Sequence, residues 1–262
     1  MRTSKEKIET ILHSNYSFQL GEYLSNGWEI FKKGFWSFTG FTLVFTAIQV
    51  GLSLIPIIGS LGSIIVSAPL AAGYYLFANR VARNEYQEFN TFFKGFDHIG
   101  PLLLQSVIQF LAIFGLAIPL IYTAFSGFFS SGNLFETDPE AWLEDPGALF
   151  APAPWAWIFL LPIVYLSIAW RWAPLFIIFY SMQPFEALET SRKLITRQWF
   201  LFFIFYIIVG LIVAGGLLFL FVGILFTLSF IFCADYAAFS KITRLIDKTT
   251  QDDVSNHFIE HH

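Results

Sequence analysis

Long uninterrupted apolar runs constrain this chain more than any other feature. Six such runs follow one another, at about 35–55, 60–80, 99–122, 154–180, 199–219 and 221–242. A helix rises about 1.5 Å per residue, so each run is long enough to cross a hydrocarbon core roughly 30 Å thick. The runs are continuous rather than alternating, which favours membrane-spanning helices over barrel strands.

Composition excludes an ordinary soluble domain. Of the 262 residues, 56% are hydrophobic and only 13% are charged. A soluble domain of this length could not bury that much apolar surface, because surface area falls too slowly with size. The sequence therefore predicts an all-α polytopic membrane protein with six transmembrane helices.

The basic residues indicate how the helices are oriented. All Lys and Arg residues except Arg171 fall into four segments, at 2–33, 80–94, 192–197 and 241–248, and the intervening connections contain none. The positive-inside rule then places both termini in the cytoplasm and the protein in the cell's inner or plasma membrane. No signal-peptide pattern occurs near the N-terminus, so we expect no removable leader.

Two regions outside the runs complete this topology. The connection at 123–153 is acidic, but its carboxylates lack the spacing of a calcium loop, so we expect a solvated extracytoplasmic loop. Residues 245–262 are predicted to form a cytoplasmic tail.

Three amphipathic segments alternate with the apolar runs. They begin near residues 18, 88 and 184, and in each of them apolar side chains recur at three- and four-residue spacing. Each segment precedes a pair of runs. The chain is thus predicted to be one integral membrane domain, 1–262, built from three units at about 18–84, 88–182 and 184–244. Each unit is an amphipathic interfacial helix followed by a transmembrane hairpin. When the sequences of the second helices of the three units are aligned, Pro69, Pro174 and Asp235 occupy the same position.

One short motif carries a family resemblance. The stretch "ALETSRKLITRQW" combines Ala187, Ser191, Leu194 and Trp199, the last of which opens an apolar run. It resembles a pattern in uncharacterised bacterial six-span membrane families, and is similar to the membrane domain fused to some glycerophosphodiester phosphodiesterases. The resemblance implies the repeat architecture and a lipid-associated setting. The soluble phosphodiesterase domain is absent from this sequence, so hydrolysis of lipid headgroups is not implied.

Arg171 is the charge that most needs explaining, since it lies within the run 154–180 in the stretch "AWRWAP". A charged side chain at mid-membrane costs roughly 2.5 to 3.5 kcal/mol on insertion scales, so it normally has a partner. Asp235, in the last run, is the other charged residue away from the end of a run, and it lies at a similar depth. We expect the two to pair as a clamp between helices. Two alternatives stay open: Arg171 reaches alone toward lipid phosphates, or the two residues form a site for an anionic substrate, a lipid headgroup or a proton. Polar residues that would line a cavity with them are Gln49, Gln105 and Gln109.

Catalytic and cofactor chemistry is not indicated. None of the five histidines lies inside a run or at metal-ligand spacing, and no phosphate-binding loop or nucleophile motif occurs. We expect no enzyme activity, no metal and no cofactor. Nucleic-acid binding is not expected either, because the basic residues are dispersed rather than gathered in one stripe.

Two functions are compatible with this pattern. The leading hypothesis is a non-enzymatic membrane protein that acts through lipids or partner proteins, as an organiser or accessory subunit of envelope processes. Its expected partners are anionic lipids, with membrane proteins or a second copy of the chain as further partners. The expected lipid contacts are Lys32, Lys33, Arg192, Lys193 and Arg197. The alternative is a small transporter or channel that uses Arg171 and Asp235.

Overall fold

The computed structural model describes residues 16–55, 58–130, 153–218 and 220–246, together with Glu9 and Leu12. All regular structure in these ranges is helical. Six helical stretches in them are long and apolar enough to cross a membrane. They are Phe35–Ser53, Gly62–Ala82, Phe89–Phe125, Pro154–Tyr180, Trp199–Gly216 and Gly223–Thr243. The prediction of an all-α, multi-pass membrane protein is confirmed at this level.

The helices follow the order of the predicted segments. They are α2 (Leu20–Lys33), α3 (Phe35–Ser53), α4 (Ile58–Ala82), η1 (Phe89–His98), α5 (Ile99–Ser130), η3 (Pro154–Phe159), α7 (Leu160–Ala169), α8 (Ala173–Tyr180), α9 (Pro184–Thr196), α10 (Trp199–Leu218) and α11 (Leu220–Thr243). The second amphipathic segment, η1, is a 3₁₀ helix. It is also the least regular of the three in sequence.

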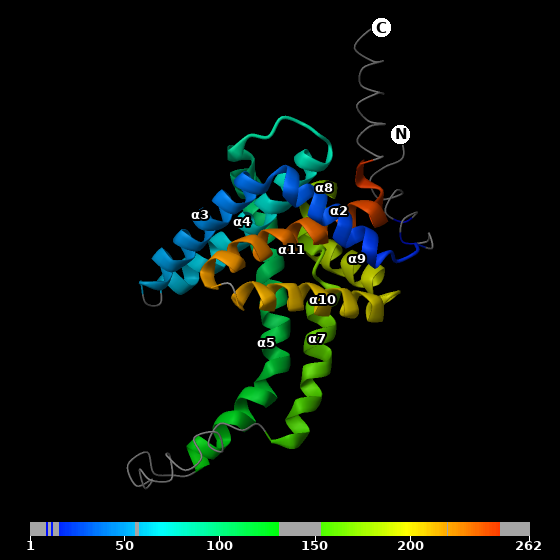
Figure 1. The fold of residues 1–262 in the computed structure, drawn as a ribbon. Helices are drawn as coiled ribbons and strands as arrows, with labels where there is room; N and C mark the ends of the chain where they lie inside the picture. The colour runs from blue at the N-terminus through cyan, green and yellow to red at the C-terminus, as the bar shows by residue number, and fades with distance from the viewer. Residues whose placement is uncertain are drawn as a thin grey trace.

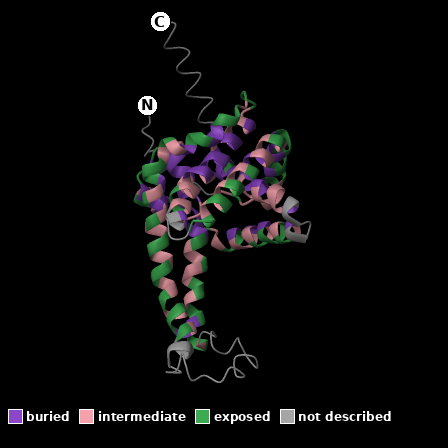
Figure 2. Ribbon diagram, turned by 90° about the vertical axis from the view of Figure 1, so that its left-hand side faces the viewer, coloured by how far each residue is buried: buried purple, intermediate pink, exposed green. Residues whose placement is uncertain are grey.

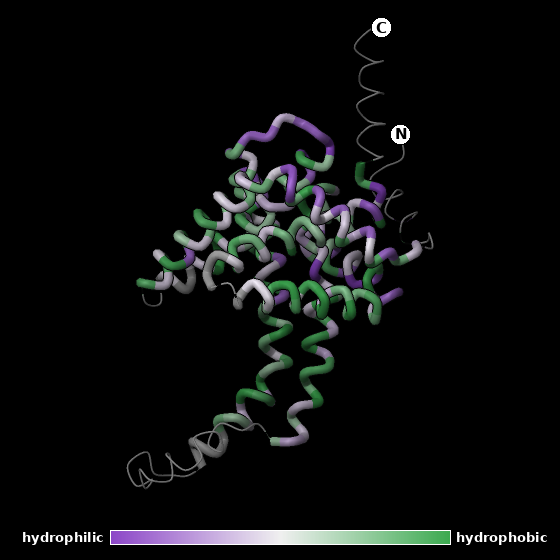
Figure 3. Tube along the Cα trace, in the orientation of Figure 1, coloured by the Kyte–Doolittle hydropathy of each residue, from purple (hydrophilic) through white to green (hydrophobic). Residues whose placement is uncertain are grey.

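Helices α5 and α7 stand apart from the rest. They run side by side and project from the body that the other helices form, while α10 lies across the place where they leave it (Figure 1). The view from the side shows the same projection (Figure 2). The projecting pair is apolar along its length, and the segment between α4 and η1 at the opposite end is hydrophilic (Figure 3). Phe110 and Leu111 on α5 are more than half exposed, as expected for a helix whose solvent is lipid.

Stacked aromatic rings fasten η1 to the first two long helices. Phe92 is fully buried between Phe41 of α3 and Phe77 of α4, and both ring centroids lie 4.1 Å from its own. Two glycines allow the backbones to approach. A Cβ added at Gly73 would lie 1.9 Å from the Phe92 carbonyl oxygen, and one at Gly95 would lie 2.0 Å from that of Pro69. The contact between α4 and η1 therefore requires glycine on both sides.

Each amphipathic segment packs against another helix: η1 and α9 against the helix that precedes them in the chain, and α2 against one from the far end. Helix α4 packs on η1, α8 packs on α9, and α11 packs on α2. Since α11 comes from the C-terminal part of the chain and α2 from the N-terminal part, the last of these contacts joins the two ends of the described fold.

Three boundaries differ in detail from the predicted ones. The run 154–180 is long and apolar enough to cross a membrane, but its helix is interrupted: α7 ends at Ala169 and α8 begins at Ala173, with Pro174 in the first turn of α8, where its missing N–H costs no helical hydrogen bond. The predicted loop 123–153 begins as helix, since residues 123–130 continue α5; its residues 131–152 lie outside the described part. In the predicted tail, apolar Leu245 is buried in the core, and residues 247–262 lie outside the described part.

Candidate functional site

Arg171 and Asp235 form an ion pair. The Arg171 Nε donates to Asp235 Oδ2 over 2.8 Å. The Asp235 side chain has no exposed surface, whereas 38% of the Arg171 side chain is exposed. The structure thus brings together the two charged residues that lie away from the ends of the predicted runs, and buries only the acidic partner completely.

Two tyrosines complete the environment of the carboxylate. Tyr206 of α10 donates its hydroxyl to Asp235 Oδ1 over 2.8 Å, and Tyr75 of α4 donates to Oδ2 over 3.3 Å. The Arg171 guanidinium also lies 5.8 Å from the centre of the Tyr206 ring, within cation–π range. We call Arg171, Asp235, Tyr75 and Tyr206 the Asp235 cluster. Sequence reasoning missed both tyrosines, because a tyrosine in an apolar run gives no sign of the helix it faces.

The Asp235 cluster is built to hold a buried charge. The carboxylate accepts three hydrogen bonds, and its charge is balanced by a guanidinium. These contacts tie α4, α10 and α11 to the link between α7 and α8. A carboxylate satisfied on both oxygens and closed to solvent can lock helices together, but it offers no open face to a substrate.

Ser191 holds the break that presents Arg171. Its hydroxyl donates to the Ala169 carbonyl oxygen over 2.7 Å and accepts from the Trp172 amide over 3.2 Å. Both backbone groups lie at the interruption between α7 and α8, where helical hydrogen bonds are missing. Because unpaired backbone groups are costly away from water, a hydroxyl from α9 stabilises this interruption. Ser191 belongs to the motif that carries the family resemblance.

The three glutamines are not part of the Asp235 cluster. Gln49 accepts a hydrogen bond from Ser63, which joins α3 to α4. Gln105 donates to Gln109 over 2.7 Å within α5. None of their hydrogen bonds in the described residues reaches Arg171 or Asp235, so these glutamines form contacts of their own.

The predicted lipid contacts differ in how far their charges are already paired within the protein. Arg192 donates two hydrogen bonds to Glu189, over 2.7 and 2.8 Å, and Lys193 lies 3.6 Å from the same carboxylate. The hydrogen bonds from Arg192 hold the pKa of Glu189 below its ordinary value. The charge of α9 is thus largely neutralised by its own acid. Lys32 and Lys33 at the end of α2 are exposed, and Lys33 donates to Asn84 Oδ1 over 2.9 Å. Arg197 has an interaction partner and is not a free cation.

A cavity of about 520 Å³ opens between α2 and α11, beside the end of α4. It is lined by Asn26, Glu29, Ile30, Lys33, Ala82, Tyr236, Ala237, Ser240, Lys241, Arg244 and Ile246. Its polar residues lie where three candidate spans begin or end, next to Phe35, Ala82 and Thr243. We call it the basic-end cavity, because all of its cations come from the basic segments of the sequence.

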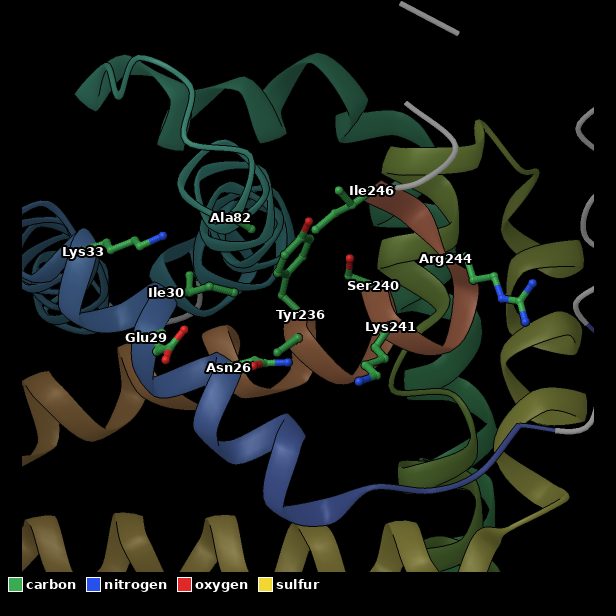
Figure 4. Close-up of a pocket in the computed structure, with 11 residues that line it drawn as sticks. Asn26, Glu29, Ile30, Lys33, Ala82, Tyr236, Ser240, Lys241, Arg244 and Ile246 are labelled. Atoms are coloured by element: carbon green, nitrogen blue, oxygen red, sulfur yellow. The ribbon is translucent and has the colours of Figure 1, made fainter. Parts of the chain in front are cut away.

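The charged residues around the basic-end cavity differ in where they point and in whether they are paired. Lys33 points toward the opening from α2, near Glu29, while Arg244 is turned away from it (Figure 4). Lys241 forms an ion pair with Glu22, so its charge is balanced within the protein. Glu29 has neither a hydrogen-bond nor an ion-pair partner among the residues that the structure describes.

No family model, curated protein or solved structure matches this chain. The likeness to bacterial six-span families therefore stays a prediction from the sequence.

Proposed function

We propose that the protein is a non-enzymatic integral membrane protein that acts through lipids, holding a phospholipid headgroup in the basic-end cavity. The observation that carries this proposal is the position of the cavity. Its polar lining lies at the ends of three candidate spans, and two of its apolar residues, Ala82 and Ala237, belong to those spans. A phospholipid has the same division between a charged headgroup and an apolar tail.

The arrangement of the amphipathic segments supports this proposal. In the proposed topology α2, η1 and α9 lie in the cytoplasmic interface, and each precedes one hairpin of a six-span domain with both termini inside. Their packing on α11, α4 and α8 is what three interfacial helices in one collar would require. The lipid-associated setting implied by the family resemblance agrees with it.

The Asp235 cluster favours this function over transport. A transporter that used Arg171 and Asp235 would need water or substrate to reach the carboxylate. Asp235 is instead fully buried beneath three donors, so the cluster fits a clamp better than a transport site.

Charge reversal in the cavity tests the proposal. We expect parent protein purified in mild detergent to retain phospholipid, as measured by native mass spectrometry, and to lose it as the salt concentration rises. Lys33→Glu should reduce retention on the order of tenfold, because a favourable charge becomes a repulsive one.

Lys94→Glu is the matched control. Lys94 is an exposed lysine of η1 that does not line the cavity, and the substitution makes the same change in net charge. Retention by this variant should equal that of the parent. Equal retention by the parent and Lys33→Glu would overturn the proposed function.

A further inference from the structure

We propose that the basic-end cavity selects a headgroup that carries both a phosphate and a primary ammonium group. The inference rests on the proposed function and assigns it a ligand chemistry. The residues that carry it are Glu29 and Lys33, which lie four positions apart on α2 and both line the cavity.

The two residues are placed to pair with each other, yet they do not. A Glu four residues before a Lys on a helix is the favourable order for an ion pair. Lys33 instead donates a hydrogen bond to Asn84, in the turn after α4. Glu29 is left without a partner in the described residues. An ammonium has three N–H donors and only one is used here, so Lys33 can still donate to a ligand. The cavity therefore presents an acceptor and a donor separately.

The overall charge of the cavity also favours a zwitterion. Lys241 is neutralised by Glu22, and Arg244 is turned away from the opening (Figure 4). The remaining charges are one cation, Lys33, and one anion, Glu29. The unpaired carboxylate of Glu29 would repel a ligand that carries two negative charges. A ligand with one phosphate and one ammonium meets an opposite charge at both ends.

The carboxylate of Glu29 also determines which kind of amine the headgroup should carry. A carboxylate gains most from a charged donor that has N–H groups, as a primary ammonium does. A quaternary ammonium has the same charge but no N–H. Phosphatidylethanolamine and phosphatidylcholine therefore make a matched pair of probes, since they differ in this group alone.

The experiment is a competition between lipids for the full-length protein in detergent. Phosphatidylethanolamine, phosphatidylcholine and phosphatidylglycerol with identical acyl chains are titrated, and bound lipid is counted by native mass spectrometry. We expect phosphatidylethanolamine to bind on the order of tenfold more tightly than phosphatidylcholine. Glu29→Gln should abolish this preference while its melting temperature stays unchanged, because the lost carboxylate costs phosphatidylethanolamine a charged hydrogen bond and phosphatidylcholine only the weaker attraction between charges. Asp97→Asn, which neutralises an exposed acid of η1 outside the cavity, should keep the preference.

The outcomes separate this inference from the proposed function. Equal binding of the two zwitterionic lipids, or an unchanged preference in Glu29→Gln, overturns the amine selectivity, while the Lys33→Glu result decides lipid binding independently. Soluble glycerophosphoethanolamine is added as a competitor. If it displaces the lipid at comparable concentration, the headgroup chemistry is supported with a soluble ligand as its source; if it does not, a membrane lipid is the source.

Discussion

At the scale of single residues, the buried carboxylate of Asp235 depends most on its neighbours. Its partners come from three parts of the chain, and only Arg171 brings a balancing charge. Removing either member of a buried pair leaves the other uncompensated, whereas replacing both with apolar side chains removes the problem. The two losses are unequal here, because Arg171 is partly exposed and Asp235 is not.

We expect Arg171→Met to lower stability by about 3–5 kcal/mol, since it leaves a buried carboxylate without a counter-charge. Asp235→Leu should cost less, because the freed guanidinium can turn toward water or lipid phosphate. The double variant should be more stable than the sum of the single losses predicts. Thermal unfolding of the four proteins in nanodiscs measures this coupling. Additive losses would show that the pair is not a clamp.

At the scale of elements, helix contacts depend on small residues at the crossings. Gly27 of α2 lies against the backbone of α11, where an added Cβ would stand 2.6 Å from the Ala234 Cα atom. Gly21, on the same helix, has nothing within 4 Å of such an atom. The two glycines are therefore a matched pair, one required by packing and one free of it.

Gly27→Ala should destabilise the protein by about 1–3 kcal/mol, because the backbones of α2 and α11 must move apart. Gly21→Ala should be neutral or stabilising by up to about 1 kcal/mol, since alanine favours the helix. Thermal unfolding measured side by side decides between them. A similar effect from both substitutions would mean that helix propensity, and not the crossing, governs this position.

At the scale of the whole molecule, the projecting pair α5 and α7 gives the protein two opposite ends, one at the tip of the pair and one on the far side of the body. The far end of α7 follows η3, and the connection between α4 and η1 lies at the other end of the fold (Figure 1). In the proposed topology these ends face opposite sides of the membrane. Native Cys233 is buried, so labelling of introduced cysteines meets little background.

Cysteine labelling in intact cells tests that topology. Trp155→Cys should react with a membrane-impermeant maleimide from outside, because Trp155 is 59% exposed and belongs to the predicted outer side. Glu85→Cys, next to the basic residue Arg83, should react only after the membrane is permeabilised. Cys233→Ala provides the background for both variants. Labelling of both positions from the same side would rule out the proposed orientation.

The sequence predicted some of the candidate site but not its full composition. The contact between Arg171 and Asp235 could be anticipated, because two opposite charges in apolar runs each need a partner. Tyr75 and Tyr206 could not, since a tyrosine is compatible with lipid, interface or core. The sequence also did not show that Glu29 is unpaired, because helical spacing alone predicts that it pairs with Lys33. The actual partner of Lys33 is Asn84, in the turn after α4.

The local sequence is enough to predict the six apolar helices, because a backbone in hydrocarbon must satisfy its own hydrogen bonds and the run lengths match a bilayer. It also determined where charge is concentrated, which underlies the proposed orientation. Three features follow only from the folded chain: α5 and α7 leave the body as a pair, Ser191 stabilises the break before α8, and α2 and α11 enclose a cavity. These features depend on contacts between residues far apart in the chain, for which local periodicity carries no information.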